Sequence, residues 1–291
     1  MNLVSRVLII NLIFTGSTVL FCSCKDESEP SNDRYCRYIP SHIGEDAALE
    51  YSLDGTKIVS GAGDGIKVWD VSTCQMILHI NTSVESVDLS PDGLKIASAN
   101  TADQVDIWDA ITGQLQLSIA ENSQFVAWSP DGLKLATVSG NDITIREASS
   151  LTALLVIHYS SPPAHLYWSP DGMKLIATGD YHGGNFQVPV WDTQTGNLLV
   201  WSMSHNSFVR CAAWSPDGAE IASIGDNGII RIWNPLTGSQ ISEMYFYEQD
   251  WGADAWDVKW SPDGQRIVVV GGTGSSSGPN ELPHCEINLV M

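Results

Sequence analysis

Short apolar segments separated by tight turns make up most of the chain from residue 42 onward. Within these segments apolar and polar positions tend to alternate, which is typical of strands with one buried face. Runs such as residues 57–60 (KIVS), 134–138 (KLATV) and 266–270 (RIVVV) are rich in the residues that strands favour. The pattern therefore predicts an all-β fold built from many short strands.

One turn sequence recurs along the chain. The tetrapeptide SPDG begins at Ser90, Ser129, Ser169, Ser215 and Ser261, and the variant SLDG begins at Ser52. Successive turns are 38, 39, 40, 46 and 46 residues apart. Proline presets φ, aspartate tolerates the turn and glycine supplies a positive φ, so the motif is typical of a tight turn. Its regular spacing predicts one structural unit repeated six times.

Each unit carries the marks of four strands. The segment before the turn ends in tryptophan in four units, at Trp128, Trp168, Trp214 and Trp260. A second segment follows the turn, a third ends in Trp-Asp in the clearest units, and a fourth follows a Thr-Gly turn. Four short strands in about 40 residues predict a blade of a β-propeller, an architecture that leaves few strand edges exposed.

Residues 42–291 resemble the WD-repeat family through the SPDG turns and the Trp-Asp pairs. The resemblance implies a buried tetrad of His, Ser or Thr, Asp and Trp in each blade. The residues that match it are His42, Ser60, Asp64 and Trp69 in the first repeat, Ser98, Asp103 and Trp108 in the second, and His205, Ser223, Asp226 (or Asn227) and Trp233 in the fifth. We expect these groups to be structural rather than catalytic, because a buried histidine needs partners for both ring nitrogens. Arg146 replaces the tryptophan of the third repeat, so we expect that blade to be held less tightly.

The last repeat ends before a fourth strand, and the segment at residues 35–39 stands where a fourth strand belongs. We expect this segment to complete the last blade, which gives about six four-stranded blades closed by strands from both termini; seven blades are the alternative. Cys36 would then lie beside Cys285. A disulfide between them would restrict the unfolded chain by several kcal/mol, and free buried thiols are the alternative.

The first 24 residues differ from the rest. A positively charged start precedes the uncharged apolar run at residues 7–21, which is shorter than the roughly 20 residues of a spanning helix. The sequence LFCSC at residues 20–24 resembles a bacterial lipobox, although Cys22 stands where a small residue is usual. We expect residues 1–24 to be a signal peptide with lipidation at Cys24, residues 25–34 to be a flexible tether, and residues 35–291 to be the propeller. Plain secretion and an uncleaved anchor are the alternatives.

The charge balance limits the partners. The chain has 34 Asp and Glu against 14 Lys and Arg, a formal net charge of −20. This excludes the cationic surface that binding to nucleic acid requires, and it disfavours docking of the folded surface on anionic lipid. Protein partners remain, with membrane contact only through a lipid anchor at the periplasmic or outer surface.

The sequence offers no catalytic motif that fits its context. Residues 274–278 (GSSSG) match the G-x-S-x-G pattern, but no helix follows, as the nucleophile elbow requires. We therefore expect no enzyme activity, no cofactor and no metal site.

Three long connections depart from the repeat, at residues 179–187, 245–255 and 271–283, and the propeller topology brings them to one face of blades four to six. Aromatic and acidic residues of this kind suit a protein interface or a sugar platform. The candidate binding residues are Tyr181, His182, Phe186, Tyr247, Glu248, Asp250, Trp251, Asp254 and Trp256. The other interpretation is that the aromatic side chains pack on their own blades. We expect a non-enzymatic interaction scaffold; the alternatives are a carbohydrate-binding propeller and a propeller glycosidase or lyase.

Overall fold

The computed structural model describes residues 8–11, 18–23, 35–40, 48–160, 162–179, 186–245, 253–273 and 285–290, with side chains in 48–160, 162–179, 186–245 and 257–269. These residues form strands and turns and contain no helix. The strands make five sheets of four strands and two of three strands, each with its strands in sequence order. The all-β prediction is confirmed.

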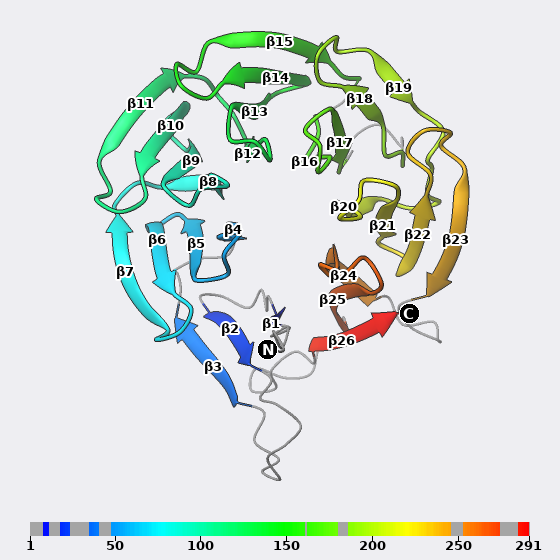
Figure 1. The fold of residues 1–291 in the computed structure, drawn as a ribbon, viewed down its shortest axis with the longest axis horizontal. Coiled ribbons are helices and arrows are strands. Elements are labelled where there is room, and N and C mark those ends of the chain that lie inside the picture. Colours follow the sequence, from blue (N-terminus) through cyan, green and yellow to red (C-terminus); the bar gives the residue numbers. More distant parts are fainter. Residues whose placement is uncertain are drawn as a thin grey trace, which may run out of the picture.

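Six sheets correspond to the six repeats and stand around a common centre, with the first strand of each innermost and the last at the rim (Figure 1). We number these blades one to six. Blade one contains β4 (Ala48–Tyr51), β5 (Lys57–Ala62), β6 (Gly65–Asp70) and β7 (Gln75–Ile80). Blade two contains β8 (Val84–Leu89), β9 (Lys95–Asn100), β10 (Gln104–Asp109) and β11 (Leu115–Ala120). Blade three contains β12 (Phe125–Trp128), β13 (Lys134–Ser139), β14 (Asp142–Glu147) and β15 (Ala153–His158).

The second half of the ring follows the same plan. Blade four contains β16 (His165–Trp168), β17 (Lys174–Thr178), β18 (Val190–Asp192) and β19 (Leu198–Val200). Blade five contains β20 (Val209–Trp214), β21 (Ile221–Gly225), β22 (Ile229–Trp233) and β23 (Gln240–Tyr245). Blade six contains three strands, β24 (Ala253–Trp260), β25 (Ile267–Thr273) and β26 (Cys285–Val290).

The expected closure of the ring is not shown. β3 (Tyr35–Pro40) pairs with β2 (Thr18–Ser23), and β2 pairs with β1 (Leu8–Asn11). Among the strand pairs of the described residues, β26 pairs with β25 alone. The three N-terminal strands lie between blades one and six (Figure 1). β3 therefore pairs with the apolar leader along one edge, and its expected pairing with β26 is not among the strand pairs of the described residues.

The SPDG turns owe their shape to one serine and one aspartate. In the second blade Ser90 donates its hydroxyl to Asp92 at 2.6 Å and accepts the N–H of Lys95 at 2.8 Å. The glycine of each such turn has a φ between +67° and +71°, a region that other L-residues rarely adopt. The same serine–aspartate bond, at 2.5 to 2.7 Å, recurs in all six blades.

The apolar cores lie between neighbouring blades. Ile66 and Val68 of blade one, for example, share a cluster with Val87 and Ile96 of blade two. Three indole N–H groups also bond to the innermost strand of the preceding blade: Trp168 to the oxygen of Ala127 (3.1 Å), Trp214 to that of Tyr167 (3.1 Å) and Trp260 to that of Ala213 (3.2 Å). Each blade is therefore held by apolar contacts and hydrogen bonds to its neighbour.

Candidate functional site

Blade five contains a buried His–Ser–Trp group. His205 is 2% exposed, and its Nε2 lies 2.7 Å from Ser223 Oγ, which also accepts the indole N–H of Trp233 at 2.7 Å. Burial is the main cause that lowers the pKa of His205, to about 3, and the Arg231 guanidinium adds to it. The imidazole is therefore neutral at ordinary pH, and the serine hydroxyl is enclosed.

The expectation that Asp226 or Asn227 completes this group is corrected by the structure. Asp226 pairs with Arg210 instead of His205, and the side-chain oxygen of Asn227 accepts the N–H of Ile229 at 3.2 Å. The Nδ1 atom of His205 is buried without a hydrogen-bond partner in the described residues. Both candidate side chains thus bond to other partners in the turn between β21 and β22.

The first two blades keep the serine–tryptophan pair. Trp69 donates to Ser60 and Trp108 donates to Ser98, both at 2.9 Å. Asp64 accepts the ammonium group of Lys67 at 2.9 Å, and His42 lies outside the described residues.

Asp103 was assigned wrongly. It is exposed in the turn between β9 and β10, with a φ of 58°. The buried acid of this blade is Asp106, which is 2% exposed and accepts an amide N–H of Asn100 at 2.7 Å. Asp106 lies in the middle of β10, where both faces of the strand are buried, whereas Asp103 belongs to the turn.

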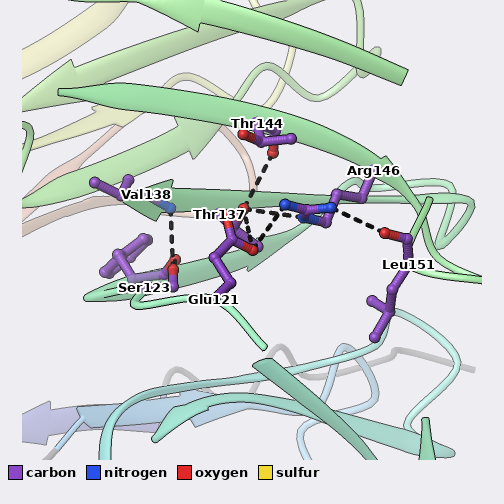
Figure 2. A network of polar contacts seen from close by, with 8 residues as sticks. Glu121, Ser123, Thr137, Val138, Thr144, Arg146 and Leu151 are labelled. Atoms are coloured by element: carbon purple, nitrogen blue, oxygen red, sulfur yellow. Dashed lines mark hydrogen bonds and ion pairs between the residues drawn. The ribbon is translucent and has the colours of Figure 1, made fainter. Parts of the chain in front are cut away.

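Blade three replaces the tryptophan with an ion pair (Figure 2). Arg146 lies 2.8 Å from Glu121 through its Nη2 and donates from Nε to Thr137 Oγ1 at 3.3 Å. Its Nη1 donates to the backbone oxygen of Leu151 at 3.0 Å. Both charged side chains are largely buried, at 13% and 10% exposure. The arginine therefore makes bonds of its own at this position, which could not be expected from the repeat pattern.

In blade four a tyrosine takes the position that the histidine has in blade five, and the tryptophan is kept. Tyr159 stands ten residues before Ser169, the offset that His205 has from Ser215. Its ring packs edge-on against Trp191 at 5.2 Å and against Trp201 at 5.9 Å between centroids. These rings line a shallow groove of about 470 Å³ at the rim between blades three and four. Counting back from each SPDG turn would have identified Tyr159 from the sequence.

Charged side chains of separate blades gather at the innermost strands, which sequence reasoning missed. Lys259 Nζ lies 3.7 Å from Asp257 Oδ2. Burial is the main cause that raises the pKa of Glu50, and Lys259 opposes it. Burial and then Glu50 raise the pKa of Asp88, whose Oδ2 accepts the backbone N–H of Trp128 at 2.5 Å. Blades one, two and six thus share one cluster of charges.

Most of the candidate binding residues lie outside the part of the chain that the structure describes. Tyr181, His182, Tyr247, Glu248, Asp250 and Trp251 lie outside the described residues. Asp254 and Trp256 belong to β24, which begins at Ala253, so the connection is shorter than expected; the register of β24 shifts around Trp256. Their side chains are not among those described.

Phe186 is the candidate residue whose side chain is placed. It packs edge-on against Phe208 with ring centroids 5.2 Å apart, and its backbone oxygen accepts the N–H of His205 at 2.7 Å. At this position the aromatic ring packs on its own blades.

The predicted covalent features remain predictions. Cys24 lies outside the described residues. Cys36 on β3 stands opposite Cys22 in the strand register, and Cys285 stands opposite Gly272. The described free cysteines are Cys74 and Cys211.

The described residues contain no group of three His, Cys, Asp or Glu side chains that could hold a metal ion. Nor does a helix of membrane-spanning length and hydropathy occur in this part of the chain.

Comparison with known proteins agrees with the fold. Residues 197–234 match the family described as WD domain, G-beta repeat. This range covers β19 of blade four and β20 to β22 of blade five, so one sequence repeat extends over two blades. Comparison with curated proteins gave no match to the chain. The match and the six sheets together support a WD-repeat family for this protein.

Proposed function

We propose that the protein is a non-enzymatic interaction scaffold of the WD-repeat type, exported and held at the cell envelope by a lipid on Cys24. The repeat match at residues 197–234 is the observation that carries this proposal. Such repeats typically mediate contacts between proteins, and the six blades give a wide surface on which partners can assemble. The partner engages the loops on one face of blades four to six.

The burial and hydrogen bonding of the His–Ser–Trp group in blade five support a binding protein over an enzyme. Ser223 is fully buried and bonded on two sides, to His205 and Trp233. A serine nucleophile has to reach a substrate, which this hydroxyl cannot do. The sets of residues that suggest hydrolysis on paper are thus engaged in holding blades together.

The test is cross-linking in cells that produce the full-length protein. We expect one partner protein to be recovered with the wild type and lost at least tenfold with the Tyr247→Ala/Trp251→Ala double variant. Leu154→Ala is the matched control, since Leu154 is an exposed apolar residue on the rim strand β15. Equal recovery with all three proteins would contradict the proposed face. Glycan turnover abolished by Glu248→Gln or Asp250→Asn would overturn the proposed function.

Localisation has a separate test. Metabolic labelling with a radioactive fatty acid should label the wild type but not Cys24→Ser, and the variant should leave the membrane fraction. Unlabelled protein in the culture medium would favour plain secretion.

A further inference from the structure

Four large apolar side chains are exposed on turns of blades two to four. Three of them directly follow the SPDG turns of blades two, three and four: Leu94 (50% exposed), Leu133 (67%) and Met173 (48%). Ile111, on the outer turn of blade two, is 66% exposed. We call these four residues the turn strip. The strip lies at the opposite edge of the sheets from the long loops of blades four to six, because alternate turns of an antiparallel meander emerge at opposite edges.

The strip is continuous because the turns contact one another. Leu94 is joined to the outer turn that carries Ile111 by the bond from Ala110 N–H to the Leu94 oxygen at 2.9 Å. A methyl group built on Gly132 would lie 3.5 Å from Pro91 Cδ of the preceding blade. On Gly172 it would lie 3.8 Å from Pro130 Cδ. The three SPDG turns therefore lie next to one another in a row.

The turn itself does not require these apolar residues. Its hydrogen bonds use the serine, the aspartate and the backbone, and none uses the side chain that follows the glycine. Blades five and six keep the same bonds with Ala219 and Gln265 at that position. Exposed apolar side chains that neighbour one another and serve no fold requirement are typical of an interaction surface.

The charge around the strip indicates the kind of partner. Six carboxylates stand on the same turns, against three lysines: Asp92, Asp109, Asp131, Glu147, Asp171 and Asp192, against Lys95, Lys134 and Lys174. The hydrogen bond from Ser90 is the main cause that lowers the pKa of Asp92, and that from Ser169 does the same for Asp171. For Asp109 and Asp192 the main cause is a backbone N–H bond. These carboxylates stay ionised, so the strip has a negative surround.

We propose that the turn strip is a docking surface for a segment of a partner protein in which lysine or arginine side chains flank a large apolar one. The apolar side chain covers Leu94, Leu133 and Met173, and the basic groups meet the surrounding carboxylates. A second copy of this chain fits poorly, because it would bring the same carboxylates face to face. The proposal deepens the proposed function, since it requires a protein partner, but it assigns a face distinct from the loop face.

The test uses the full-length protein and three synthetic peptides of equal length, one of arginine and leucine, one of arginine and serine, and one of glutamate and leucine. We expect the arginine–leucine peptide to bind the wild type at least tenfold more tightly than either of the others. The Leu133→Ser/Met173→Ser variant should lose this preference, with affinity reduced about tenfold. Leu236→Ser is the matched control, because Leu236 is 74% exposed on a turn of blade five, where Ala219 takes the place of the large apolar residue.

Three outcomes would overturn the proposal. Equal binding of the arginine–serine peptide would mean that charge alone attracts it, and equal loss in Leu236→Ser would mean that the strip has no special role. Self-association that disappears in Leu133→Ser/Met173→Ser, measured by sedimentation, would make the occupant a second copy. None of these results affects the cross-linking test at the loop face, so failure here is distinguishable from failure of the proposed function.

Discussion

At the scale of single residues, His205 links stability to pH. Its folded pKa of about 3 lies below the ordinary value of 6.5. Between pH 3 and pH 6.5 the unfolded chain therefore binds a proton at this residue that the native state does not bind. Stability from this residue is complete above pH 6.5 and is lost as the pH falls toward 3, by about 1.4 kcal/mol per pH unit.

The first prediction compares urea unfolding at pH 6.5 and 5.5. The wild type should lose about 1 kcal/mol more than His205→Gln over this interval, because the unfolded histidine is already half protonated at pH 6.5 and the amide has no such titration. His158→Gln is the control, because His158 is 79% exposed, and it should keep the pH dependence of the wild type. Identical slopes for all three proteins would show that His205 is protonated normally in the folded state.

The ion pair of blade three gives the second prediction. Glu121→Gln leaves the Arg146 guanidinium largely buried and without its counter-charge, which should cost about 3 kcal/mol of unfolding free energy in chemical denaturation. The Glu121→Gln/Arg146→Met variant should recover most of this loss, because no buried charge remains. Asp142→Asn, in the exposed pair with His158, should change stability by less than about 0.5 kcal/mol. A single variant as stable as the wild type would mean that the ion pair makes no net contribution.

Repetition determines which residue roles were predictable. The Ser60–Trp69 and Ser98–Trp108 bonds follow from positions that recur at fixed offsets. Asp103 was misassigned because a sequence does not show which acid near a hairpin belongs to the turn and which to the strand. The cluster of Glu50, Asp88 and Lys259 was missed because its members come from separate innermost strands and share no motif.

At the scale of elements, the repeats predicted the strands well and the ring closure poorly. SPDG or SLDG marks strand ends in each blade, and Trp-Asp does so in the clearest ones, through local chemistry, so the four-stranded sheets of blades one to five appear as expected. The pairing of β3 depends on which distant strand competes for it, and the leader strand β2 supplies a competitor. Removal of the leader at Cys24 would leave β3 without this partner.

The third prediction follows from that competition. In the processed protein β3 should be free to join β26, and mass spectrometry after proteolysis should find Cys36 linked to Cys285. In the unprocessed chain, where Cys36 stands opposite Cys22, this link should be missing. Cys211→Ser, at a buried position in blade five, is the control and should leave the result unchanged. Unlinked Cys36 and Cys285 peptides from the processed protein would contradict the closure.

At the scale of the whole molecule, charged side chains on the innermost strands of blades one and six interact electrostatically. Lys259 of blade six has a raised pKa, chiefly through Asp257 and then Glu50 of blade one. The pKa values of Glu50 and Asp88 are raised as well, so their effect on stability is opposite to that of His205: it is complete below their ordinary pKa values and is lost as the pH rises through the folded ones.

The fourth prediction removes this cation. Lys259→Met should raise both carboxyl pKa values further, so the loss of stability should be larger at pH 7.5 than at pH 4.5. We expect about 1 kcal/mol at pH 7.5, since the lysine side chain is 59% exposed and solvent screens its interactions. Thermal unfolding at the two pH values measures it, with Lys174→Met as the control at the start of β17 in blade four. A loss that is equal at both pH values would indicate packing instead of charge.

The three indole bonds between blades run in one direction. The indoles of Trp168, Trp214 and Trp260 donate to the blade before them, and none of these three bonds requires a blade that comes later. A chain that emerges from the ribosome N-terminus first therefore presents each acceptor before its donor is made. Each new blade can dock on a finished one as it is synthesised, so assembly of the blades can keep pace with translation, and blade six follows once β26 has been made.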